Sequence, residues 1–317
     1  MHFVSHTEVT QLLPMNECIG LMRSLFSLPS EQVLNPLRTK MWLPDYRGVL
    51  GMMPSFIEPW GIMGIKVLSV FPENYKKGLS SHQGIVILFE AETGAILGSF
   101  DADSITAIRT AAVSALMTDL LALPTANSLA LIGTGEQAYS HLEAISYVRS
   151  LQNVWVWSPT PSKREQFART QSVKFGIEIG VKDSIEQTVA EADIVCTLTP
   201  STLPVLKSEW IRPGTHINAV GASTPQAREL DSELVARSRL FVDNVESAMN
   251  ESGDILIPIG EELITQQHIV GAIADVLSNT CAGRTHADEI TLFKSLGIGL
   301  EDLAVAHHIY KKLTHHA

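Results

Sequence analysis

The fold is decided by residues 129–138, which read Leu129-Ala130-Leu131-Ile132-Gly133-Thr134-Gly135-Glu136-Gln137-Ala138. An apolar run ends there in a glycine turn and reopens as a helix. In a dinucleotide-binding turn the first glycine permits the sharp bend, the second lets the backbone approach a pyrophosphate, and a Gly or Ala three positions later allows close helix–strand packing. An ordinary strand-to-helix turn would show the same short motif, so only the flanking sequence can distinguish the two kinds of turn.

The sequence after this turn alternates short apolar runs with helix-like stretches. Such alternation predicts a parallel sheet covered by helices on both faces. We therefore expect a Rossmann domain over residues 121–300. The apolar runs are Val154 to Trp157, Ile177 to Val181, Ile194 to Thr197, His216 to Val220 and Leu240 to Val242, and the intervening helices include Ser162 to Thr170 and Ser184 to Glu191.

The first 120 residues have a different pattern, which predicts a mixed α+β domain. Thr7 is positioned to cap a first helix that runs towards Phe26. Ser104 to Leu121 is a long helical pattern, and a last helix near Glu301 to Leu313 is expected to return to this domain, which we therefore assign to residues 1–120 plus 301–317. The expected strands are Gln32 to Lys40, Gly48 to Ser55, Gly61 to Ser69, Gly84 to Glu90 and Ala95 to Asp101, with a hairpin turn at Glu92-Thr93-Gly94.

Composition limits the function classes. A chain of 317 residues has room for two domains, and a net charge of −11 argues against a nucleic-acid partner. Three widely spaced cysteines, Cys18, Cys196 and Cys281, suggest neither a disulfide framework nor a thiolate metal site. No signal sequence and no membrane-spanning apolar run is evident, so we expect a cytoplasmic protein without a resident metal.

Three cationic residues stand where solvent exposure is not the obvious interpretation. They are Arg38, Lys66 and Arg109, each inside an apolar strand or helix context. A buried cation needs a partner, and an arriving carboxylate is one, because Arg offers it a bidentate fork and Lys a compact charge. A structural salt bridge would explain any one of them equally well.

Two further segments are candidates for cofactor contacts. Ser81 and His82 lie in a polar loop that enters a strand, where a histidine could donate a proton or touch a cofactor. Ser158 and Thr160 follow the second Rossmann strand in place of the carboxylate that would bind an adenosine ribose, and Lys163-Arg164 come next. Hydroxyls and cations there favour the 2′-phosphate of NADPH, whereas a solvated helix start is the alternative.

These residues resemble the ornithine cyclodeaminase and mu-crystallin family of Rossmann proteins over nearly the whole chain. The matching blocks are the strand around Lys66, residues 105–112, 133–138, 220–223, 251–254 and 293–297. The resemblance implies a two-domain homodimer in which Arg38, Lys66 and Arg109 bind a substrate carboxylate. It also implies an NAD(P)H site, to which we assign Ser81, His82, Thr110, Gly133, Gly135, Glu136, Gln137, Ser158, Thr160, Lys163, Arg164, Thr199, Val220, Ser295 and Leu296.

One position helps to separate the branches of the family. Cyclodeaminases look like Gly-x-Asp-x-Pro-Gly-Lys, in which the Asp serves the second amino group of the substrate. Here Gly221-Ala222-Ser223-Thr224-Pro225-Gln226 has Ser223 at that place and lacks the Gly-Lys pair. The segment instead resembles the ketimine reductase branch.

The sequence thus predicts an NAD(P)H-dependent reductase of cyclic ketimine carboxylates, with NADPH favoured. The substrates expected are Δ1-pyrroline-2-carboxylate and Δ1-piperideine-2-carboxylate. Lys66, Arg109 and His82 are the candidate catalytic residues, and Ser223 joins the three cations as a substrate contact. An ornithine cyclodeaminase, an alanine dehydrogenase on the same scaffold, or a ligand-binding protein like mu-crystallin are the alternatives.

Overall fold

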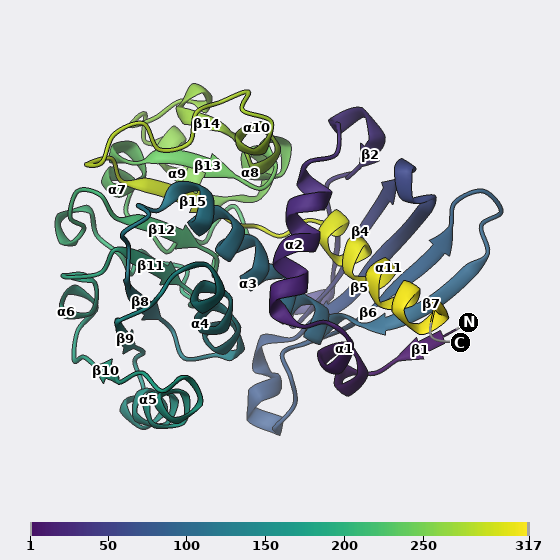
Figure 1. The fold of residues 1–317 in the computed structure, drawn as a ribbon, viewed down its shortest axis with the longest axis horizontal. Coiled ribbons are helices and arrows are strands. Elements are labelled where there is room, and N and C mark those ends of the chain that lie inside the picture. Colours follow the sequence, from purple (N-terminus) through teal and green to yellow (C-terminus); the bar gives the residue numbers. More distant parts are fainter. Residues whose placement is uncertain (1, 316–317) are drawn as a thin grey trace. The chain divides into compact units, whose positions relative to one another are not determined.

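The computed structural model describes residues 2–315, and only the backbone of Tyr46, Tyr75 and His315. The chain divides into two compact units (Figure 1): unit 1 comprises Met1–Thr110 and Gly297–Ala317, and unit 2 comprises Ala111–Leu296. The sequence placed the boundaries near residues 120 and 300. The first division instead falls inside α3 (Ala102–Leu121), a helix that contains neither Gly nor Pro and so continues without a break. Residues 316 and 317 of the expected first domain lie outside the described residues.

Unit 1 is a mixed α+β unit built on a seven-stranded sheet. The strand order is β1-β7-β6-β5-β4-β2, with β3 also paired to β4. β1 runs parallel to β7, and the other pairs are antiparallel. The strands are β1 (His2–Val4), β2 (Val33–Leu34), β3 (Thr39–Trp42), β4 (Val49–Ile57), β5 (Ile62–Val70), β6 (His82–Glu90) and β7 (Ile96–Asp101), and the helices packed with them are α1 (His6–Leu12), α2 (Met15–Phe26) and α11 (Gly299–His315).

One face of this sheet is covered by α11, with α2 beside it (Figure 1). Side chains alternate along a strand, so residues two apart share a face. In β5 the covered face carries Ile62, Gly64 and Lys66, all buried. A Cβ at Gly64 would lie 2.6 Å from Leu303 Cδ1 of α11 and 2.5 Å from the Ile87 carbonyl oxygen, so the close approach of this helix requires glycine there.

The sequence expectation was wrong at two places in unit 1. The single first helix is interrupted at Leu13-Pro14, because Pro14 has no N–H to continue the ladder, and the first turn is capped from Ser5 rather than Thr7. The expected strand 32–40 is two short strands separated by residues 35–38, which include Pro36 and leave Arg38 between the strands. The short strand β1 was not foreseen.

Unit 2 is a Rossmann-type α/β unit, as the sequence predicted. Its eight parallel strands follow the order β10-β9-β8-β11-β12-β15-β13-β14. The chain adds β9 and β10 on one side of β8 and then returns to add β11 on the other side, so the order of strands reverses between β8 and β11. Ligands bind such sheets beyond the carboxyl ends of the strands at this reversal. The strands are β8 (Ser128–Ile132), β9 (Asn153–Trp157), β10 (Ile179–Val181), β11 (Ile194–Thr197), β12 (His216–Ala219), β13 (Arg239–Val242), β14 (Ile269–Ala272) and β15 (Thr291–Lys294).

Helices connect these strands and enclose an apolar core that includes Ile132, Val195, Ile217 and Leu292. Strands β14 and β15 were not predicted from the sequence. Among the described helices α3 alone is long and apolar enough to span a membrane, but 78% of that window is buried, as in a core helix. The remaining helices of unit 2 are α4 (Glu136–Val148), α5 (Pro161–Phe175), α6 (Ile185–Val189), α7 (Ser232–Arg237), α8 (Val245–Glu251), α9 (Gly253–Gly260) and α10 (Ile273–Leu277).

Candidate functional site

Lys66 is buried in unit 1 beneath the amino-terminal turn of α11. The period of two along β5 places it on the covered face, where its Nζ lies 3.0 Å from Asp302 Oδ1 and 2.5 Å from Thr106 Oγ1. Its side chain is 3% exposed. The pKa of Lys66 is lowered to about 8. Burial is the main cause and the positive charges of Arg109 and Arg38 add to it, whereas Asp302 offsets part of the lowering. Lys66 is therefore an ammonium that can exchange its proton near neutral pH.

Arg109 reaches the same turn from α3. Its Nη1 lies 2.6 Å from Glu301 Oε2, and its Nε lies 3.1 Å from Asp302 Oδ1. Burial lowers the pKa of Arg109, but Asp302 and Glu301 more than offset this, so the net pKa is raised and the guanidinium stays charged. Asp302 Oδ1 thus accepts hydrogen bonds from both Lys66 and Arg109.

Gly297 completes this cluster. Its φ is +69°, and a Cβ there would lie 2.1 Å from Arg109 Nη1, so both backbone conformation and space require glycine. Its carbonyl oxygen accepts a hydrogen bond of 2.9 Å from Arg38 Nη2. The turn 297–302 therefore gathers the three cations that the sequence singled out.

Three cations and two carboxylates make up this cluster. Arg38, Lys66 and Arg109 stand against Glu301 and Asp302. Several cations brought together in this way can bind an anionic group such as a carboxylate. Glu301 and Asp302 were missed from the sequence, where they resemble the ordinary acidic first turn of a helix; their partners are 192–236 positions away along the chain.

Ser81 and His82 lie at the start of β6 in unit 1. Ser81 Oγ is 3.0 Å from His82 Nδ1. His82 is exposed, and its pKa is lowered by partial loss of hydration and by the positive charge of Lys66. Thr110, the last residue of unit 1, is buried, and its hydroxyl has no hydrogen-bond partner among the described residues.

The glycine turn of unit 2 follows β8. Gly133 has φ +122°, and a Cβ there would lie 2.6 Å from the Leu198 carbonyl oxygen. Gly135 is the N-cap of α4 and supplies no side-chain cap, so the first N–H groups and the positive end of the helix dipole remain for an anion. Ala138 is fully buried, and the Oε1 of Gln137 is buried without a partner among the described residues. These features fit a pyrophosphate-binding turn; Glu136 opens the helix.

Some of the polar residues that follow β9 are exposed, whereas others are buried or bonded within the fold. Ser158 is buried, whereas Thr160 and Lys163 are exposed. Arg164 Nη1 donates a hydrogen bond of 2.5 Å to the Lys182 carbonyl oxygen and Nη2 lies 4.0 Å from Asp183 Oδ1. Arg164 is therefore used inside the fold, and Lys163 is the cation of the pair that remains exposed for a phosphate.

The remaining cofactor candidates also lie at the carboxyl ends of neighbouring strands. Thr199 follows β11, Val220 follows β12, and Ser295 follows β15. The Thr199 hydroxyl donates to Glu229 Oε1, and Leu296 N donates to Asp243 Oδ2. Ser223 lies half-buried in the turn after β12. The sheet thus brings together the turns that the sequence could place only one by one.

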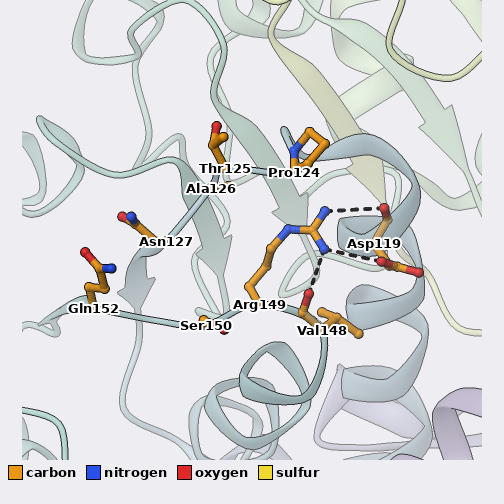
Figure 2. A pocket seen from close by; sticks show the side chains of 9 residues that line it. All are labelled: Asp119, Pro124, Thr125, Ala126, Asn127, Val148, Arg149, Ser150 and Gln152. Atoms are coloured by element: carbon orange, nitrogen blue, oxygen red, sulfur yellow. Dashed lines mark hydrogen bonds and ion pairs between the residues drawn. The ribbon is translucent and has the colours of Figure 1, made fainter.

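A pocket of about 460 Å³ lies elsewhere in unit 2, and Figure 2 shows its lining. Asn127 and Gln152 come directly before β8 and β9, so the pocket is at the amino ends of these strands, opposite the glycine turn. Its Arg149 points to Asp119 and Val148 and donates to the carbonyls that end α3. This arginine caps a helix, and we do not assign the pocket to the site.

The chain belongs to the ornithine cyclodeaminase/mu-crystallin family, whose pattern matches residues 1–317. The prediction of family from the sequence is confirmed. Among relatives, ketimine reductase mu-crystallin of Mus musculus is 38% identical over 282 residues, which are 89% of this chain and 86% of that protein.

Two solved structures support the fold assignment. Δ1-Pyrroline-2-carboxylate reductase of Thermococcus litoralis, in complex with NADH and L-proline, superposes with a TM-score of 0.96 at 38% identity and covers 100% of this chain and 98% of that one. An archaeal alanine dehydrogenase dimer with bound NAD has a TM-score of 0.93 at 30% identity, with coverage of 99% and 97%.

Proposed function

We propose that this protein is an NAD(P)H-dependent reductase of cyclic ketimine carboxylates that converts Δ1-pyrroline-2-carboxylate to proline and Δ1-piperideine-2-carboxylate to pipecolate. The observation that carries the proposal is the gathering of Arg38, Lys66 and Arg109 around the turn 297–302, in a chain that also holds a dinucleotide-binding turn. The similarity to a reductase solved with NADH and proline supports it.

The residues of unit 1 would bind and orient the imino acid. The carboxylate of the imino acid would bind to the three cations, which would fix the position of the adjacent C=N carbon. The imino acid and the cofactor would then react as an oriented pair and not as two mobile molecules. When bound, NAD(P)H supplies a hydride to that carbon, and the C=N electron pair moves to nitrogen, which takes a proton. Lys66, whose pKa is lowered to about 8, is the buried group suited to hold that proton.

The residues of unit 2 would hold the cofactor. The turn from Gly133 to Gln137 receives the pyrophosphate, and Ser158, Thr160 and Lys163 receive a 2′-phosphate. No carboxylate follows β9 to repel that phosphate, so NADPH should be used at least as well as NADH.

We further propose a homodimer formed through the uncovered face of the unit 1 sheet. Strands β5 and β6 pair so that Val67 lies opposite Ile85 and Met63 opposite Phe89, on the face away from α11. These side chains are exposed or half-buried in the single chain. A continuous apolar sheet face of this kind is typical of a protein interface.

Turnover measurements test the proposal against its alternatives. NADPH oxidation with cyclic imino acids, and none with pyruvate plus ammonia, would exclude alanine dehydrogenase. Ammonia release from ornithine with catalytic NAD⁺ would instead indicate a cyclodeaminase, and cofactor binding without any turnover would indicate a ligand-binding protein.

A further inference from the structure

Three buried charged residues of unit 2 are not explained by the proposed function: Glu229, Asp254 and Lys294. All are buried in unit 2, at most 1% exposed. Lys294 Nζ lies 3.0 Å from Asp254 Oδ2, and Asp254 Oδ1 accepts hydrogen bonds from the backbone N–H groups of Glu229 (2.9 Å) and Leu230 (3.0 Å). The three form one connected cluster, which we call the buried charge triad.

The triad holds the backbone of two turns. Glu229 accepts hydrogen bonds from Thr199 N at 2.7 Å, after β11, and from Gly221 N at 2.6 Å, after β12. Lys294 donates to the Ala222 carbonyl oxygen at 2.6 Å. A Cβ at Gly221 would lie 2.6 Å from Glu229 Oε1 and 2.1 Å from the Thr199 carbonyl oxygen, so the second turn packs directly on the acid and on the first turn.

The energetic cost of the triad indicates a positional role. Taking charges out of water costs several kcal/mol per ion, and apolar residues of similar volume often stabilise a fold as well or better. Burial raises the pKa of Glu229 above its ordinary value, and the positive charge of Lys294 offsets only part of this rise. The buried charges therefore cost the fold part of its free energy of unfolding, and their hydrogen bonds hold backbone groups in fixed positions.

We propose that Glu229, Lys294 and Asp254 are positioning residues that fix the turn 220–224, and with it Ser223 and the seat of the nicotinamide end of the cofactor. The expected changes in kcat and in the isotope effect rest on the proposed function. Its structural part concerns only the turn and can be measured without cofactor or substrate.

Glu229→Gln is the primary test, because the amide has the same shape but presents NH₂ where a carboxylate oxygen accepts from Thr199 or Gly221. Hydrogen exchange of the cofactor-free protein should become faster in peptides covering residues 197–224 and remain unchanged in the peptide covering residues 133–148. With Δ1-pyrroline-2-carboxylate, kcat should fall about tenfold or more, because small misplacements are costly in an oriented reaction.

The kinetic isotope effect separates positioning from mere loss of structure. With NADPH carrying deuterium at the transferred position, the isotope effect on kcat should rise in Glu229→Gln, because a poorly placed nicotinamide makes hydride transfer slower. The dissociation constant of NADP⁺ should change less than about threefold, because the pyrophosphate turn and Ser158 are untouched.

Lys294→Met provides a second variant with the same expectations, since it removes the donor to Ala222 and keeps the volume. If it fails to fold, Glu229→Gln alone decides. Lys174→Met is the matched control: this lysine of unit 2 forms an exposed pair with Glu143, and its loss should change neither exchange at 197–224 nor the isotope effect.

Unchanged exchange and isotope effect in folded Glu229→Gln would overturn the proposal, as would a lower melting temperature with unchanged kcat per folded molecule. A wild type that reduces no imino acid would refute the proposed function instead. In that case the exchange measurement still decides whether the triad holds the turn.

Discussion

At the scale of single residues, the three cations are not free charges awaiting a substrate but members of a cluster with Glu301 and Asp302. Asp302 bridges Lys66 and Arg109 through one oxygen. The carboxylates therefore fix the positions of Lys66 and Arg109 and raise the pKa values of both cations.

Removal of the Lys66 charge tests the cluster directly. Lys66→Met keeps the volume but removes one cation, and kcat/KM for the imino acid should fall about a hundredfold, because a desolvated charge pair is worth about 2 to 5 kcal/mol. NADPH affinity, which depends on unit 2, should remain. Lys77→Met, at an exposed lysine of the same unit, is the control. A loss of less than about threefold in Lys66→Met would contradict the assignment.

The pH dependence of kcat/KM tests the role of Asp302. The pKa of Lys66 is about 8, so the protonated form is present below that pH and is lost as pH rises through it. Activity should therefore decline on the alkaline side. Asp302→Asn removes the charge that raises the pKa, so the decline should move to lower pH by about one unit or more. An unchanged alkaline limb would show that another group titrates.

At the scale of elements, the turn 297–302 joins fold and site. Gly297→Ala should lower both stability and kcat/KM, because the added Cβ meets the Arg109 guanidinium and φ is positive. Gly94→Ala is a matched control, since Gly94 also has positive φ (+74°) but an added Cβ would meet nothing within 4 Å. It should cost about 1 kcal/mol of stability and leave activity intact. Equal effects of the two on kcat/KM would contradict the contact with Arg109.

The turn after β9 governs the choice between cofactors. Lys163→Ala should raise the KM for NADPH and leave the KM for NADH unchanged, because only the 2′-phosphate needs the exposed cation. Initial rates with both cofactors measure this. Equal changes for NADPH and NADH, or a strong NADH preference in the wild type, would refute the phosphate site.

Local patterns in the sequence predicted the elements better than they predicted the site partners. A short apolar run located β11, and the glycine turn located α4, because both are short-range features. The helix break at Pro14 and the strand β15 were not predicted from the sequence. Glu301, Asp302 and Glu229 could not be paired from sequence, because their partners are brought to them by strand order and helix packing.

At the scale of the whole molecule, the uncovered sheet face of unit 1 predicts a dimer. Ile85→Lys places a charge within the apolar face and should shift the mass measured by light scattering from two chains towards one. Val173→Lys, at an exposed helix position in unit 2, should leave the mass unchanged. A wild-type monomer at micromolar concentration would refute the interface.

The most direct test of the proposed activity is NADPH oxidation by the purified protein in the presence of Δ1-pyrroline-2-carboxylate, with the product identified by chiral chromatography. We predict that absorbance at the dihydronicotinamide band falls only when the imino acid is present, and that proline accumulates in equal amount. Absence of oxidation with every cyclic imino acid, together with ammonia release from ornithine in the presence of NAD⁺, would contradict the account and assign a cyclodeaminase.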